Sequence, residues 1–170
     1  MSGEISIHGK VQDYDHKTIF MIQVSAWVLQ EDKYSHTEVN RAYTNEEGIY
    51  ELLVLPGTQI TVRFDTHWSL VNAKEWHPSV VANIDAKQDI VLNRSLMRVG
   101  TGGDDIATLD AFTAYQFCAM WTAREKDRES VRTYAESAAS RLSQMKMPLP
   151  EFSEFQQKLI GFFLKQAESP

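Results

Sequence analysis

The residues best suited to chemistry lie in one short segment, from Phe64 to Pro78. It holds two carboxylates, two histidines and two tryptophans: Asp65, His67, Trp68, Glu75, Trp76 and His77. Residues two apart on a strand project from the same side, so both carboxylate–histidine pairs could converge if the segment's ends pair as a hairpin. Two imidazoles with two carboxylates suit a divalent transition metal, or a general acid–base pair in which a carboxylate orients its histidine. The candidate catalytic residues are therefore Asp65, His67, Glu75 and His77, and the candidate metal ligands are His67 and His77.

The same segment also has a structural interpretation, which we favour. Its spacing matches no established metal or catalytic motif, and a polar loop at one end of a β-sandwich would place Trp68 and Trp76 across the edge of the core. A third interpretation uses these tryptophans as stacking surfaces for a ligand, and we prefer it to the metal site. We expect no cofactor.

Alternating apolar residues predict short strands over the first 95 or so residues. The expected strands are a first one around Ile5–Val11, a long central one over Ile19–Leu29, one over Val39–Tyr43, two around the Pro56-Gly57 turn, and a final hairpin of Val80–Ile84 with Ile90–Leu92. Seven short strands linked by tight turns indicate a two-sheet sandwich.

After Arg98 the apolar period becomes helical, following the glycines at positions 100, 102 and 103. Three helices are expected at about 105–125, 128–146 and 151–167, with Pro148 and Pro150 ending the second. In the first, Ile106, Leu109, Phe117, Met120 and Trp121 lie along one stripe, with Phe112 beside it. The helices could bury their apolar stripes on each other, on the sandwich or on a second copy of the chain, and we favour packing within the chain. The fold class expected is α+β, with a sandwich domain over 1–98 and a helical region over 99–170.

Composition excludes several functional classes. The net charge of −6 is spread over both halves without a basic face, which argues against a nucleic-acid partner. No apolar run is long enough for a membrane span and the N-terminus lacks a signal core, so we expect a soluble, cytoplasmic chain without a membrane partner. The one cysteine, Cys118, cannot form an internal disulfide and fits a reducing compartment.

Four short segments carry a resemblance to a known family: Ile7-His8-Gly9-Lys10-Val11, Val24-Ser25-Ala26-Trp27-Val28, the stretch from Ala42 to Tyr50, and Leu55-Pro56-Gly57-Thr58. Over about residues 4–95 the chain resembles the carboxypeptidase regulatory-like domain. The resemblance implies a transthyretin-like, seven-stranded sandwich. The family motifs are structural, so the resemblance supplies no catalytic residue.

Two functions remain open. The first is a non-enzymatic interaction or accessory protein that binds another protein or a second copy of itself. Its candidate binding residues are Trp68, Trp76, Phe155, Phe162 and Phe163, because the last helix has a wide apolar face that must be covered. The second is a small enzyme or a protein binding a small molecule or metal, which would use Asp65, His67, Glu75 and His77 at a cleft between sandwich and helices.

Overall fold

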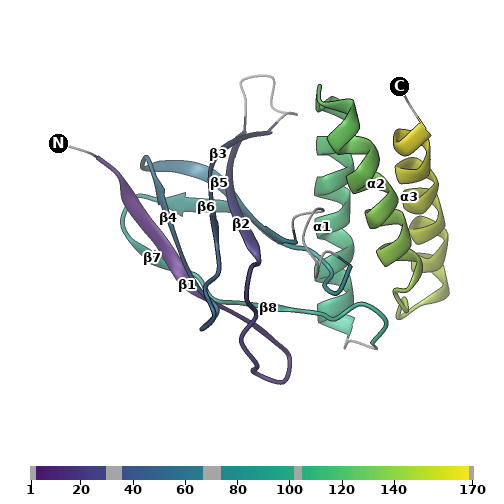
Figure 1. Cartoon of the computed structure of the whole chain (residues 1–170), viewed down its shortest axis with the longest axis horizontal. Helices are drawn as coiled ribbons and strands as arrows, with labels where there is room; N and C mark the ends of the chain where they lie inside the picture. Colours follow the sequence, from purple (N-terminus) through teal and green to yellow (C-terminus); the bar gives the residue numbers. More distant parts are fainter. Residues whose placement is uncertain (1–2, 30–35, 67–73, 102–104, 169–170) are drawn as a thin grey trace. The chain divides into compact units, whose positions relative to one another are not determined.

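The structure is a computed structural model that describes residues 3–29, 36–66, 74–101 and 105–168 (Figure 1). The described strands are β1 (Ile5–Asp13), β2 (Gln23–Leu29), β3 (His36–Tyr43), β4 (Ile49–Val54), β5 (Gly57–Asp65), β6 (Ser79–Ala86), β7 (Ile90–Val91) and β8 (Arg94–Leu96). The helices are α1 (Asp105–Arg124), α2 (Arg128–Ser143) and α3 (Pro150–Glu168). The predicted α+β class, strands first and then three helices, is confirmed.

The chain divides into two compact units. Met1–Thr66 and Ser79–Leu96 form the first, called here the β unit, and His67–Pro78 with Met97–Pro170 form the second, the helical unit. The segment just before β6 therefore groups with the helices, which sequence patterning does not indicate. A boundary at residues 98 and 99 between separately folding domains stays a prediction.

The β unit consists of two sheets. One has the order β4-β1-β7 with β8 also paired to β1, and the other has the order β3-β2-β5-β6. Alternate residues of β1 and β4 are buried, as a sheet with one face on a core requires. The rings of Tyr50 on β4 and Phe64 on β5 meet edge to face at 5.7 Å, so the core lies between the sheets. The eighth strand was not expected, and it pairs with β1 in parallel.

Two glycines of the family-like motifs have a physical requirement. Gly48, in the turn before β4, has a φ of +76°, which glycine adopts without steric cost. A Cβ on Gly9 would overlap the carbonyl of Leu92, which runs alongside β1 between β7 and β8. The hydroxyl of Tyr50 donates to that carbonyl at 2.6 Å, and burial raises the pKa of Tyr50 well above its usual range, so it stays a donor.

Two strand predictions are wrong. The central strand begins at Gln23 rather than Ile19, because Met21 has a φ of +60° and Phe20 is 51% exposed instead of facing the core. Residues 80–92 do not form a hairpin, because β6 pairs with β5 whereas β7 joins β1 in the other sheet.

The three helices share one core. The predicted apolar positions of α2 are all buried: Val131, Tyr134, Ala135, Ala138, Leu142 and, just beyond the helix, Met145. The stripe expected on α1 is only partly buried: Phe112 belongs to the core, whereas Ile106 is 79% exposed and Leu109 and Met120 are exposed as well. Its core residues include small ones, Ala107, Ala111 and Cys118, beside Tyr115. Among the described residues, no helix combines the length and apolarity needed to cross a bilayer.

Candidate functional site

The candidate segment from the sequence is divided by the structure. His67 and Trp68 lie outside the described residues. Asp65 ends β5 in the β unit, whereas Glu75, Trp76 and His77 belong to the helical unit. The Asp65 side chain is 3% exposed; it pairs with Nη2 of Arg63 at 3.1 Å and accepts from the Thr66 amide at 2.8 Å. These contacts give Asp65 a structural role.

His77 is joined to the helices. Its side chain is buried, and Nδ1 lies 2.7 Å from the hydroxyl of Tyr115 on α1. Its backbone amide donates to the Met97 carbonyl, and Nη1 of Arg141 on α2 donates to the Trp76 carbonyl at 2.9 Å. The segment is thus fixed to the helical unit by two buried side chains, Tyr115 and Arg141, that sequence reasoning did not single out. An arginine among the buried positions of α2 was the only signal for this role.

Glu75 and Trp76, the two residues before His77, have structural partners as well. Trp76 is 4% exposed, and the guanidinium of Arg98 lies 4.3 Å from its ring centroid. The Glu75 carboxylate accepts from Arg98 at 3.3 Å, and the Glu75 carbonyl accepts from the Val99 amide. Among residues 3–29, 36–66, 74–101 and 105–168, no cluster of three or more His, Cys, Asp or Glu side chains could hold a metal.

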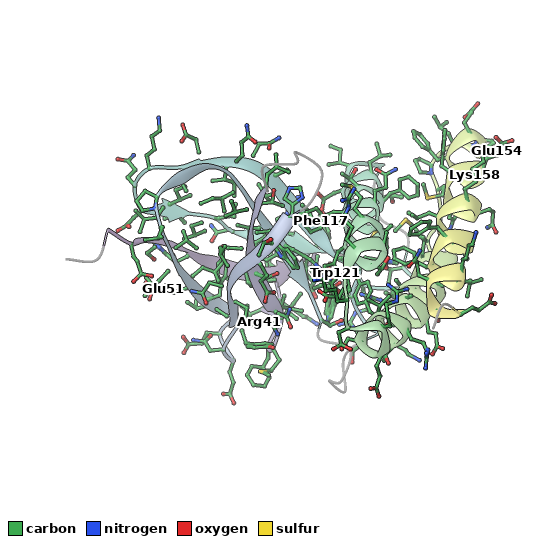
Figure 2. The ribbon with its side chains drawn as sticks, turned by 90° about the horizontal axis from the view of Figure 1, so that it is seen from above. Arg41, Glu51, Phe117, Trp121, Glu154 and Lys158 are labelled. Atoms are coloured by element: carbon green, nitrogen blue, oxygen red, sulfur yellow. The ribbon has the colours of Figure 1, made fainter. Side chains whose placement is uncertain are left out.

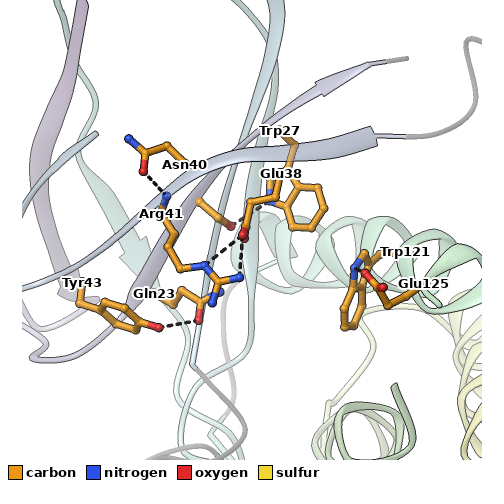
Figure 3. Close-up of polar contacts among 9 residues, drawn as sticks. Gln23, Trp27, Glu38, Asn40, Arg41, Tyr43, Trp121 and Glu125 are labelled. Atoms are coloured by element: carbon orange, nitrogen blue, oxygen red, sulfur yellow. Dashed lines mark hydrogen bonds and ion pairs between the residues drawn. The ribbon is translucent and has the colours of Figure 1, made fainter. Parts of the chain in front are cut away.

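The β unit carries a polar surface on β2 and β3, shown in Figure 3. The guanidinium of Arg41 donates twice to Oε1 of Glu38, at 3.0 and 2.6 Å, and the Tyr43 hydroxyl donates to Gln23 at 3.1 Å. The hydrogen bonds to Glu38 raise the pKa of Arg41 above its ordinary value, so the guanidinium stays charged. These polar groups already have partners, and exposed ion pairs contribute little free energy, so we do not select this surface as the binding site.

The strongest candidate for a binding surface lies on α3. Four apolar residues follow one another at intervals of three, four and three positions, and we call them the α3 seam: Phe152, Phe155, Leu159 and Phe162. This is the spacing of the a and d positions of a coiled coil. Phe155 is 54% exposed and the other three are partly exposed. Leu159 and Phe162 also pack in part against the core of the helical unit, so Phe155 is the most open residue of a partly exposed apolar strip.

Two buried residues fix the rotation of α3 and so place the seam. Phe163 is 0% exposed, and its ring meets those of Tyr115 and Tyr134 at 6.3 and 6.5 Å. The side-chain amide of Gln156 donates to the carbonyls of Leu142 and Met145, both at 2.8 Å, and so satisfies acceptors at the end of α2. Phe163, expected as a binding residue, is thus a core residue in this structure.

The ends of the seam are polar. Glu151, in the first turn of α3, is exposed. Near the other end, Nη2 of Arg128 donates to Oε1 of Gln166 at 3.0 Å. Glu154 and Lys158 project from α3 into solvent (Figure 2), and the Lys158 ammonium lies 5.8 Å from the ring centroid of Phe155. A charged border beside a short apolar strip is the usual composition of a contact surface.

Comparison with known proteins gives no family. No family model and no curated protein matches the sequence. Among solved structures, a proposed carbohydrate binding protein from Bacteroides uniformis has 18% identity and a TM-score of 0.41 over 58% of this chain and 43% of its own. The shaft pilin of Lactobacillus rhamnosus GG has 8% identity and a TM-score of 0.38 over 58% of this chain and 52% of its own.

A third solved structure covers more of the sequence. The 9R-lipoxygenase from Cyanothece has 10% identity and a TM-score of 0.43 over 92% of this chain but 29% of its own. The chain thus spans between 29% and 52% of the length of these three proteins. Likeness at this level carries no information about function, and membership of the carboxypeptidase regulatory-like family stays a prediction.

Proposed function

We propose that this chain is a non-enzymatic interaction protein and that the α3 seam is its contact surface. The observation that carries the proposal is the 54% exposure of Phe155, in line with three further apolar residues on a helix whose rotation is fixed. An aromatic side chain is among the largest contributors of buried area at protein interfaces. Phe155 stands in line with three further apolar residues at helical spacing, so it is the natural anchor of a contact on this helix.

The helical unit supports the proposal in a second way. The side chains flanking the seam on its inner side, Gln156 and Phe163, are already buried, so α3 cannot rotate to hide the seam without exposing them. Such a helix resembles the preformed half of a helix-in-groove or helix-pair contact, which uses anchors at intervals of three and four residues. Preformed surfaces lose little conformational entropy on binding.

Photo-crosslinking in the cells that naturally make the protein tests this function. Phe155 is replaced by a photoreactive phenylalanine analogue, and in a matched control Leu164 is replaced instead, since it is 48% exposed on the same helix but outside the seam. We expect one discrete crosslinked species from position 155 and none from position 164. Monomer alone from position 155, or the same pattern from both positions, would contradict the proposal.

A further inference from the structure

We infer that the α3 seam binds a second copy of this chain, with the two α3 helices antiparallel about a two-fold axis. This inference rests on the proposed function and names the partner. The evidence is the order of apolar residues along the seam and the order of charges along its open border. Both are self-complementary when one helix is reversed, as a two-fold interface requires.

The apolar order gives four matched layers. In an antiparallel pair the a positions of one helix meet the d positions of the other. Phe152 then packs against the partner subunit's Phe162, and Phe155 packs against the partner subunit's Leu159. The two-fold axis repeats both layers, so all four seam residues of each chain are covered and no polar residue falls inside the contact.

The charge order selects the antiparallel direction. The open border of the seam carries Glu151, Lys158 and Lys165, which are all exposed and lie seven residues apart. Reversing one helix brings Glu151 beside the partner subunit's Lys165 at both ends of the contact, which is favourable. The two Lys158 side chains face each other at the centre, so two favourable contacts are opposed by one unfavourable contact.

A parallel pair lacks these contacts. There, each border residue would have to meet a residue on the inner flank of the other helix, where Gln156 and Phe163 are buried and uncharged. The acidic first turns would also lie together, which is unfavourable. A helix of another protein could also cover the seam. In that case there would be no reason for the charges along the open border of α3 to complement those of a second, reversed copy.

Sedimentation velocity and light scattering of the purified full chain test the inference. We expect a concentration-dependent mass that approaches twice the 19.4 kDa of one chain. Phe155→Glu should raise the dimer dissociation constant at least about tenfold, because the two-fold axis removes two anchors at once. Leu164→Glu, a similarly exposed position outside the seam, should leave it unchanged, and circular dichroism verifies that both variants are folded.

Charge exchange tests the direction of the pair. Glu151→Lys alone and Lys165→Glu alone should each weaken the dimer several-fold, and the two together should restore it. Failure of the double variant to restore the dimer would overturn the antiparallel geometry. A chain that stays monomeric at every concentration would overturn self-association, and a crosslink from position 155 to a different protein would then leave the interaction function standing.

Discussion

Gln156 offers the sharpest test of how the fold places the seam. Its side-chain amide satisfies the carbonyls of Leu142 and Met145 at 2.8 Å each, and the residue is 6% exposed. Gln156→Leu keeps the size of the side chain but removes the donor. The Met145 carbonyl would then lose this donor, whereas the Leu142 carbonyl still accepts from the Met145 amide at 3.1 Å, so we expect a loss of about 1–2 kcal/mol in the free energy of unfolding.

Urea unfolding followed by helical circular dichroism measures this loss. The matched control is Gln157→Leu, because Gln157 is the next residue and is exposed; its substitution should change the unfolding free energy by less than about 0.5 kcal/mol. The denaturant dependence of the unfolding free energy should be the same in both variants. Equal stability of the two variants would refute the idea that Gln156 fixes α3 against α2.

Three further outcomes follow from single contacts. Gly9→Ala should lower the thermal midpoint, because its Cβ would overlap a backbone carbonyl. Gly161→Ala should raise the midpoint slightly, since that position is helical and has open space around it. Calorimetry that gave the reverse order would be inconsistent with this packing. Asp65→Asn should cost roughly 3 kcal/mol in denaturant unfolding, because it removes the charge of one member of a buried ion pair; an unchanged stability would reopen a functional role for Asp65. Hydrogen bonds to Ser130 lower the pKa of Asp127. The carboxylate therefore stabilises the start of α2 fully at pH values above the ordinary pKa of aspartate, and it loses this effect as the pH falls through the lowered pKa. The thermal midpoint of Asp127→Ala should therefore lie below that of the wild type near neutral pH and converge with it under acid; a constant gap would contradict the assignment.

Local patterns predicted the elements that depend on local chemistry. The turn before β4 needs a residue with a left-handed backbone conformation, and Asn45 and Gly48 are the residue types that predict such a turn. The spacing of Val131, Tyr134 and Ala138 likewise identified the buried face of α2. In both cases the signal lies within a few residues of the structure that it specifies.

Patterns failed where the outcome depended on distant residues. The α1 prediction followed the spacing of the large apolar residues, but the shared core takes up Ala107 and Ala111 on another face of the helix and leaves Ile106 in solvent. The strand pattern of residues 80–92 holds no information about which sheet each strand joins. That choice depends on the pairing of β7 with β1, which brings together residues more than 80 positions apart in the sequence, such as Ser6 and Asp89.

The candidate site shows the same division. Spacing alone identified the apolar face of α3, with Phe155 and Phe162 on it, but could not tell that Phe163 would be buried. That distinction depends on Tyr115 and Tyr134, which belong to other helices. Similarly, the chemistry suggested for His77 could not be weighed without Tyr115, which lies 38 residues away in the sequence.

Hydroxyl-radical footprinting of Phe155 tests the central claim most directly. The purified chain at high dilution is compared with the chain in its native cell extract, and the buried Phe163 serves as an internal reference. We predict that Phe155 is reactive at high dilution and protected in the extract, while Phe163 is protected in both. Equal reactivity of Phe155 in the two samples would contradict the assignment of the α3 seam as a contact surface.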